Sequence, residues 1–531
     1  MVLRGAPPTA DALPVAVDQS GARAGVSRRA LLRAGGAVGT IAATGGVQLA
    51  NAPAAAATTP LALSTDLATH LLRRVTYGPT PALLAEVRTT GYSAWIEKQL
   101  NPAAIADPTC DQILALFPDL KLSAQAVKLK YGSGDVWKHL HELRAATIVR
   151  AVWSKRQLFE VMAEHWTNHF TVYPGDEPEA FCKSTEDREV IRRHALGRFA
   201  DLLTASATSP AMLGFLDNAF SSADNINENY GRELLELHTV GVDGGYTEAD
   251  VQNAAKALTG WTIDSSTLKF RYDPAMRYVG PLRVMGWSHA NADRAQGVAI
   301  GKSLLSYLAR HPATAKHLAH KLATRFVSDA PSAALVDALA KTYLASGTDI
   351  KPVLRQLLGS AEFKASSGKK LRRPLEAMAM MLRATASTYD ITKGAEPAGQ
   401  LDWRSGSMGQ SPMGWHPPDG YPDIATPWLG TSGMLGRWNF ALTATGGWVA
   451  GIVPKSPTEL AGGAARPRTA GGVVDAITQR LALQKFAPAH RAALLRAVDA
   501  AEGDVMSDDE LRWRGRDLVA LVLSSPYLQV R

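Results

Sequence analysis

Start and stop signals for helices recur along almost the whole chain, and this pattern constrains the fold more than any other feature. Thr247 stands three residues before Asp250, the spacing of a capping box, and Gly260 closes the same helix. Pro81 opens another helix, which Gly91 ends. The sequence therefore predicts a mainly α protein, a large domain of many helices. Further helices are expected over residues 66–75, 92–100, 135–170, 184–205, 227–239, 293–310, 312–328, 331–346, 349–360, 374–388, 471–484, 487–502 and 507–524.

Strand signals are few. Thr267–Tyr272 and Arg283–Trp287 are expected to pair as one small hairpin. A Pro- and Gly-rich stretch over residues 452–470 is predicted to be a flexible connector.

A second Pro- and Gly-rich stretch, residues 395–436, is predicted to be a long ordered loop. A loop of this length in a compact domain is usually functional or disordered, and its tryptophans favour packing. We expect it to pack on the helices beside His165 and Glu233, where it would close one side of a pocket. Its tryptophans and the one that follows are Trp403, Trp415, Trp428 and Trp438.

Residues 1–57 have the pattern of a twin-arginine export signal. The charged motif is Ser27-Arg28-Arg29-Ala30-Leu31-Leu32-Arg33, and an uncharged Ala- and Gly-rich run follows it. Small residues at 54–57 offer a cleavage site for signal peptidase. The run is long enough for a membrane anchor but only weakly apolar, so a cleaved signal is favoured. We therefore expect a single helical domain over residues 58–531, exported in folded form to the periplasm or the medium, with no transmembrane segment.

Charge and cysteine content limit the classes of function. The net charge of +8, part of which lies in the signal, is too small on 531 residues to indicate nucleic-acid binding. Two cysteines cannot build a disulfide scaffold or a four-cysteine zinc site. Cys110 and Cys182 either form one bond or stay apart and buried, and the sequence leaves both alternatives open.

The first candidate site is a pair of histidines. His165 and His169 are four residues apart, so on a helix they share one face. Leu158, Val161 and Met162 lie on the same face, which therefore points inward. Two inward imidazoles can hold a divalent transition metal. The alternative is that each is a core histidine with one hydrogen bond.

The second candidate site is the polar side of the helix over residues 227–239. Glu233 would complete a metal site of two histidines and a carboxylate, together with His165 and His169. Arg232 and Glu236 are four residues apart and can pair. The alternative is a solvated charged face held by this pair. Taken alone, both motifs favour the structural alternative.

The sequence lacks the motifs of several other common catalytic and cofactor-binding sites. It contains no nucleophile elbow, no phosphate-binding P-loop, no dinucleotide-binding glycine fingerprint and no covalent haem site.

Several blocks together resemble the family called domain of unknown function 1800. The likeness spans about residue 63 to the C-terminus. The blocks are residues 70–78 (HLLRRVTYG), 165–170 (HWTNHF), 227–247 (NENYGRELLELHTVGVDGGYT), 257–261 (ALTGW), 372–374 (RRP), and Met408-Gly409-Gln410 with Trp415 and residues 417–418.

The resemblance implies a mostly helical exported protein without a settled activity. It also implies a partner, since family members often sit beside a second exported protein of alkaline-phosphatase-like type. One departure concerns Arg277-Tyr278, which precede Gly280-Pro281 where the family often has a His-Asp pair. If that histidine is a metal ligand in the family, this chain lacks the ligand.

Two functions follow from these observations. The first is an exported metal-dependent enzyme, a hydrolase or an oxidoreductase acting on a polymer or small molecule outside the cytoplasm. Glu236 or His238 would then act as acid or base, and Arg232 would orient a substrate anion. The second is a non-catalytic binding or assembly protein that works with a co-exported partner through its tryptophan-rich segment.

Overall fold

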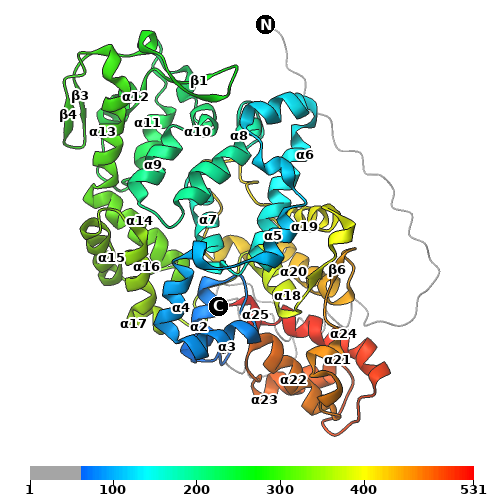
Figure 1. The fold of residues 1–531 in the computed structure, drawn as a ribbon. Helices are drawn as coiled ribbons and strands as arrows, with labels where there is room; N and C mark the ends of the chain where they lie inside the picture. The colour runs from blue at the N-terminus through cyan, green and yellow to red at the C-terminus, as the bar shows by residue number, and fades with distance from the viewer. Residues whose placement is uncertain (1–60) are drawn as a thin grey trace, which may run out of the picture. The chain divides into compact units, whose positions relative to one another are not determined.

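The computed structural model describes residues 61–531, and helices make up most of this part of the chain (Figure 1). The predicted mainly α fold is therefore confirmed. The predicted export signal over residues 1–57 lies outside the described residues and stays a prediction. The first helices are α2 (Leu67–Val75), α3 (Pro81–Thr90), α4 (Tyr92–Gln99), α5 (Pro108–Leu114), α6 (Ala124–Trp153) and α7 (Gln157–His169).

Side-chain caps explain where many helices begin. Asp66 accepts a hydrogen bond from the backbone nitrogen of Thr69 at 2.9 Å and so starts α2. The predicted capping box is confirmed, since Asp250 accepts from the nitrogen of Thr247 at 2.8 Å and Thr247 accepts from that of Asp250 at 3.2 Å. The helices from here to the first strand are α8 (Glu179–Glu186), the π-helix η4 (Asp187–Arg192), α9 (Phe199–Ala207), α10 (Pro210–Phe215), α11 (Asn229–Glu233), the π-helix η6 (Leu234–His238) and α12 (Glu248–Leu258).

The helix predicted over residues 227–239 is two elements, α11 and η6. The change to π-helical turns lets Thr239 donate its hydroxyl hydrogen to the carbonyl of Leu234 at 2.6 Å. Gly231 brings α11 against α12, because a Cβ there would lie 2.8 Å from the nitrogen of Ala255.

The predicted hairpin pairing was wrong. The structure has two local hairpins, β1 (Trp261–Asp264) with β2 (Lys269–Tyr272), and β3 (Leu282–Val284) with β4 (Trp287–His289). Positive φ at Met285 and Gly286, 48° and 96°, makes the two-residue turn between β3 and β4. Pairing each strand with its neighbour closes a shorter loop than pairing β2 with β3–β4.

The next helices carry part of the candidate site. Glu376 accepts from the backbone nitrogen of Arg373 at 2.9 Å and so helps to start α18. Gly78 lies against the same helix, since a Cβ there would lie 2.9 Å from the Cα of Met380. These helices are α13 (Gly297–Ala309), α14 (Pro312–Phe326), α15 (Ala333–Ala345), α16 (Ile350–Gly359), α17 (Ala361–Lys364) and α18 (Pro374–Ala384).

The prediction of a loop over residues 395–436 holds for residues 408–430 only. Helix α19 (Glu396–Ser407) fills the first part and α20 (Thr431–Gly446) begins before the end. Ala398, Leu401 and Ser405 are fully buried on one face of α19, and this packing outweighs the low helix propensity of its glycines.

Residues 452–470 are likewise not an irregular connector. Ile452–Val453 form β6, which pairs with β5 (Thr388–Tyr389). Ser456 and Glu459 then make a capping box that starts α21 (Pro457–Leu460), a signal that the high Pro and Gly content concealed. The last helices are α22 (Ala470–Ala482), α23 (Pro488–Ala497), α24 (Asp508–Ser524) and α25 (Pro526–Gln529).

Two further expectations concern cysteines and membranes. Cys110 on α5 and Cys182 on α8 are both free and buried, so they do not form the disulfide bond that the sequence left open. Within residues 61–531, no helix combines the length and the apolar composition that crossing a bilayer requires.

Candidate functional site

Helix α7 carries the polar motif HWTNHF and is buried along most of its length. Glu160, Glu164, His165 and His169 are each less than one tenth exposed. Polar side chains at such positions require partners or water. Cavities lie along two sides of this helix.

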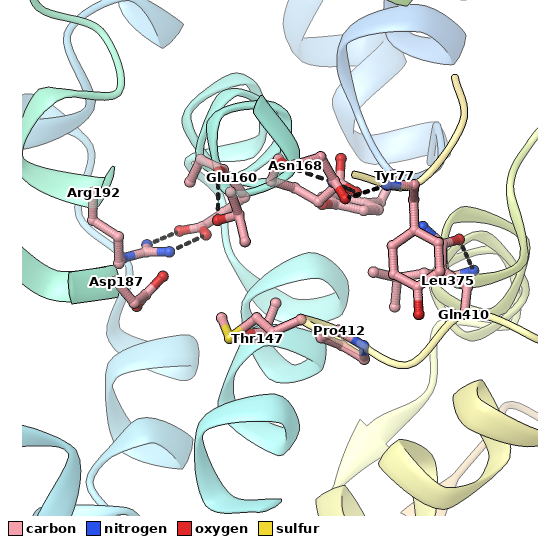
Figure 2. Close-up of a pocket in the computed structure, with 14 residues that line it drawn as sticks. Tyr77, Thr147, Glu160, Asn168, Asp187, Arg192, Leu375, Gln410 and Pro412 are labelled. Atoms are coloured by element: carbon pink, nitrogen blue, oxygen red, sulfur yellow. Dashed lines mark hydrogen bonds and ion pairs between the residues drawn. The ribbon is translucent and has the colours of Figure 1, made fainter. Parts of the chain in front are cut away.

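The smaller cavity holds about 30 Å³, room for about two water molecules (Figure 2). Arg192 donates to both carboxylate oxygens of Glu160, at 2.9 and 2.6 Å, with Asp187 beside the pair. Gln410 accepts from the backbone nitrogen of Leu375 at 3.1 Å on the opposite side. This space is too small for a substrate, and we interpret it as a hydrated polar contact.

The larger cavity, here called the α7–α14 cavity, has a volume of about 280 Å³. This is near the lower limit for pockets that bind small molecules. Helix α7, helix α14, the start of α18 and the segment 419–424 enclose it. Its lining side chains include His165, Asn168, His169, His320, Lys321, Thr324, Arg373, Asp419, Tyr421 and Asp423.

Three of these side chains present polar atoms without a protein partner. The side-chain amine of Lys321 forms no ion pair or hydrogen bond with any residue of 61–531. In the same described range, Nε2 of His165 and Oγ1 of Thr324 are buried and have no hydrogen-bond partner. His165 is only 6% exposed. Because buried polar groups are costly to leave unpaired, Nε2 of His165 and Oγ1 of Thr324 favour a polar ligand or water in the cavity, next to the partly buried amine of Lys321.

Burial changes the protonation of the groups in this cavity. It lowers the pKa of Lys321 to about 8, although Asp423 and Asp419 act in the opposite direction. Burial and the charge of Lys321 lower the pKa of His165 to about 3. His165 is therefore neutral near pH 7, whereas Lys321 can gain or lose a proton just above that pH.

A buried network of ion pairs forms one wall of the cavity. Arg373 lies 2.6 Å from Glu164 and 3.0 Å from Glu376. Arg325 pairs with Glu376 and lies 3.5 Å from Asp423. These contacts connect α7, α14, α18 and the segment 419–424 at one point, so they fix the shape of the cavity.

The loop over residues 408–430 packs on α7, as predicted, and closes one side of the cavity. The backbone nitrogen of Tyr421 donates to Oδ1 of Asn168 at 3.2 Å. Gly420 has a φ of 77°, and a Cβ there would overlap the carbonyl oxygen of Asn168. Lys370 also donates to the carbonyl of Asp423 at 2.5 Å.

The two histidines predicted as metal ligands have different surroundings. His165 lines the cavity, as described. His169 donates through Nε2 to the carbonyl of His238 at 3.1 Å, and His317 donates to the carbonyl of Leu237 at 3.3 Å. Both carbonyls lie at the end of η6, where helical partners run out. His169 therefore acts as a cap for this helix, with only Nδ1 left for another partner.

Glu233, the third predicted ligand, is half-buried and forms no ion pair within the described residues. Burial raises its pKa, together with Glu236 and Asp419. Glu233 is not among the residues that line the α7–α14 cavity. Among residues 61–531, no three His, Cys, Asp or Glu side chains are grouped so as to hold a metal ion. The assignment of His165, His169 and Glu233 as metal ligands therefore stays a prediction. The described residues do not form a complete set of ligands.

The predicted catalytic residues do not line the cavity. Arg232 donates to both carboxylate oxygens of Glu248 at 2.9 and 2.6 Å, which ties α11 to α12. Glu236 accepts from the hydroxyl of Tyr246 at 2.6 Å. His238 is fully buried, and neither of its ring nitrogens has a hydrogen-bond partner in the described part of the chain.

Arg277, at the position where the resemblance led us to expect histidine, is also fully buried. It donates to the carbonyl of Ala257 at 2.5 Å and to Oδ1 of Asn291 at 2.6 Å. This arginine joins the end of α12 to the segment that follows β4, a structural role.

Sequence reasoning missed Lys321, Thr324, Arg373, Asp419 and Asp423. On an amphipathic helix Lys321 is indistinguishable from a surface lysine. In the sequence Arg373 stands out only as part of the RRP block over residues 372–374. The missing information is which helix faces meet, and no local spacing provides it.

The comparisons with known proteins identify a family but no activity. The family described as "Protein of unknown function (DUF1800)" matches residues 70–530. No curated protein and no solved structure matches the chain. The match covers most of the sequence and confirms the predicted resemblance, so this chain belongs to the DUF1800 family.

Proposed function

We propose that this chain is an enzyme of the hydrolase type whose active site is the α7–α14 cavity. The observation that carries the proposal is the convergence of Lys321, His165 and Thr324, all without protein partners in residues 61–531, on one cavity of ligand size. Unpaired buried polar groups in a concave site are the usual mark of a binding or catalytic centre.

Lys321 is the proposed proton-transfer group. General acid–base catalysis works best when the pKa of the catalytic group is near the operating pH, and burial lowers the pKa of Lys321 to about 8. In its protonated form, which dominates at pH 7, the ammonium group can give a proton to the leaving group and recover one from the attacking water. His165 and Thr324 would hold the substrate by hydrogen bonds.

The proposed mechanism uses protein groups only. The transition metal predicted from the sequence would need a third ligand besides His165 and His169, and the described residues offer none in place.

A panel of aryl esters, phosphate esters and amides tests the proposal. For any substrate of the panel that the parent protein hydrolyses, we expect Lys321→Met to lower kcat/KM by about 100-fold or more. Lys316→Met is the matched control, because Lys316 lies on the same helix, is exposed and pairs with Asp337 at 3.1 Å. Turnover by Lys321→Met equal to that of the parent protein would refute the proposal.

We also propose that the enzyme acts outside the cytoplasm, as the twin-arginine motif predicts. Replacing Arg28 and Arg29 with lysine preserves the charge but removes the motif. The doubly substituted protein should stay in the cytoplasm, whereas the parent should be recovered from the periplasm or medium. Equal export of both would contradict this location.

One observation favours the second predicted function, assembly with the co-exported alkaline-phosphatase-like partner. Trp403 and Trp448 are 69% and 62% exposed, and Arg404 links them by donating to the carbonyl of Trp448 at 3.3 Å. Exposed tryptophan and arginine are enriched at interfaces. Trp403→Ser should abolish co-purification of this partner, while Phe220→Ser, at a residue as exposed as Trp403, should not. Unchanged co-purification with Trp403→Ser would exclude this surface.

A further inference from the structure

The ion-pair network beside the α7–α14 cavity lies next to further buried arginines. Its cations are Arg325, Lys370, Arg373 and Arg531, and its carboxylates are Glu164, Asp329, Glu376 and Asp423. Arg74, Arg372 and Arg437 are buried nearby and form no ion pair within residues 61–531. In this region cationic side chains therefore outnumber carboxylates, even when the α-carboxylate of Arg531 is counted.

Several buried nitrogen atoms of these arginines have no hydrogen-bond acceptor. Within residues 61–531, Nε and Nη2 of Arg325, Nη1 of Arg372 and Nε of Arg74 have no hydrogen-bond partner. Burial, with Arg531 next to it, lowers the pKa of Arg372 to about 9. Buried positive charge without a counter-ion is strongly unfavourable, so the network favours a bound anion.

The network meets the cavity at Arg373. Nε and Nη2 of Arg373 donate to carboxylates, whereas Nη1 has no hydrogen bond to the described residues. Lys321, Thr324 and Nε2 of His165 line the same space without partners. Together they offer the unpaired charge of Lys321, the free Nη1 donor of Arg373 and further hydrogen-bonding groups on the lining of one cavity.

The carboxylates of the cavity do not cancel this charge. Asp423 is already neutralised by Arg325 at 3.5 Å and Lys370 at 3.4 Å. Asp419 is exposed at the mouth, where it accepts from Nε1 of Trp415 at 2.7 Å. Lys321 is therefore the cation of the cavity lining that has no paired carboxylate within residues 61–531.

We infer that the α7–α14 cavity binds a ligand through an anionic group, a phosphate-type or carboxylate oxyanion held by Lys321, Arg373 and Thr324. This rests on the proposed function, since it names the substrate class of the same cavity. Guanidinium and ammonium groups form short, charge-assisted hydrogen bonds with such oxyanions.

Thermal unfolding of the full chain tests the inference, with sodium phosphate, sodium acetate and sodium chloride compared at equal ionic strength. At about 10 mM, phosphate or acetate should raise the unfolding midpoint by about 2 °C or more relative to chloride. A larger effect of phosphate assigns a phosphate-type ligand, and a larger effect of acetate assigns a carboxylate. No shift with either anion overturns the inference.

Variants locate the anion. Lys321→Met should weaken binding of the effective anion by about tenfold or more in calorimetry, because it removes one charge from the site. Thr324→Val is a second, milder variant that keeps the shape of the side chain. Lys316→Met should bind as the parent does. Parent-like affinity in both Lys321→Met and Thr324→Val places the anion elsewhere and overturns the inference.

The two proposals fail separately. If anion binding depends on Lys321 but no substrate of the panel is hydrolysed, the inferred ligand class is supported and the proposed enzymatic activity is refuted. If Lys321 is needed to hydrolyse neutral esters but neither anion affects stability, the enzymatic activity is supported and the inferred anionic ligand is refuted.

Discussion

The backbone nitrogen of Tyr421 lies 3.2 Å from Oδ1 of Asn168, and this hydrogen bond joins the loop over residues 408–430 to helix α7, two of the segments that enclose the α7–α14 cavity. The carbonyl of the same asparagine lies against Gly420, where no side chain fits. This contact therefore holds the loop against helix α7 where the two enclose the cavity.

Gly420→Ala should loosen this loop. The added Cβ overlaps the Asn168 carbonyl, so we expect a loss of roughly 1–3 kcal/mol and rapid proteolysis between Trp403 and Trp438. Gly409→Ala is the matched control, because Gly409 has a φ of 94° but open space around its Cα. Proteolysis of Gly420→Ala at the rate of the control would show that the contact with Asn168 does not hold the loop.

Lys321→Met should stabilise the protein at pH 7. The pKa of Lys321 is lowered from about 10.5 to about 8, so the folded state binds fewer protons than the unfolded state between these values. The stability cost of the charged amine, up to about 3 kcal/mol, is present below pH 8 and disappears as the pH rises to 10.5.

Denaturant titrations at pH 7 and pH 10 measure this difference. The free-energy gap between Lys321→Met and the parent should shrink at the higher pH, while Lys316→Met should show no such change. The charged and titratable groups around Lys321 are His165, His169, His317, His320, Arg373, Asp419 and Asp423. A gap that stays constant with pH would contradict the burial of this amine.

His169→Leu should destabilise the protein by roughly 1–3 kcal/mol. It leaves the His238 carbonyl without the donor that now lies 3.1 Å away. His169→Gln keeps an N–H donor and should cost less. Melting curves with and without a chelator decide between capping and metal binding, since a capping role predicts no effect of chelator on the parent. A lower melting point of the parent with chelator, absent in His169→Leu, would restore the metal role.

Glu376→Gln should be among the most destabilising single changes, at roughly 3–5 kcal/mol. Burial alone would raise the pKa of Glu376, but Arg325, Arg531 and Arg373 lower it well below its usual range. Its stabilising contribution is present above the unfolded pKa of about 4.5 and is lost as the pH falls below that value.

Urea titrations from pH 7 to pH 3 test this. The parent should lose stability with acid more steeply than Glu376→Gln. Glu97→Gln is the control, because Glu97 forms an exposed ion pair with Arg355 at 2.6 Å and should cost less than about 1 kcal/mol. A loss in Glu376→Gln as small as in the control would show that the arginines do not depend on this carboxylate.

Local patterns in the sequence determined most of the secondary structure. The capping box at Thr247 and the turn residues Pro81 and Gly91 mark helix ends within three or four residues, so no distant contact is needed to recognise them. His165 could be found for the same reason, because its spacing from His169 places both on one inward face.

Only the tertiary structure decided the strand partners and the composition of the site. Trp261–Asp264 pairs with the next strand because the chain folds back there, which the composition of these residues does not reveal. Lys321, Arg373 and Asp423 come from two helices and a loop that are distant in the sequence, and they meet only because α7, α14 and α18 bury their polar faces together. A helix start depends on neighbours a few residues away, whereas the burial and pKa of a side chain depend on which surfaces the whole chain brings into contact.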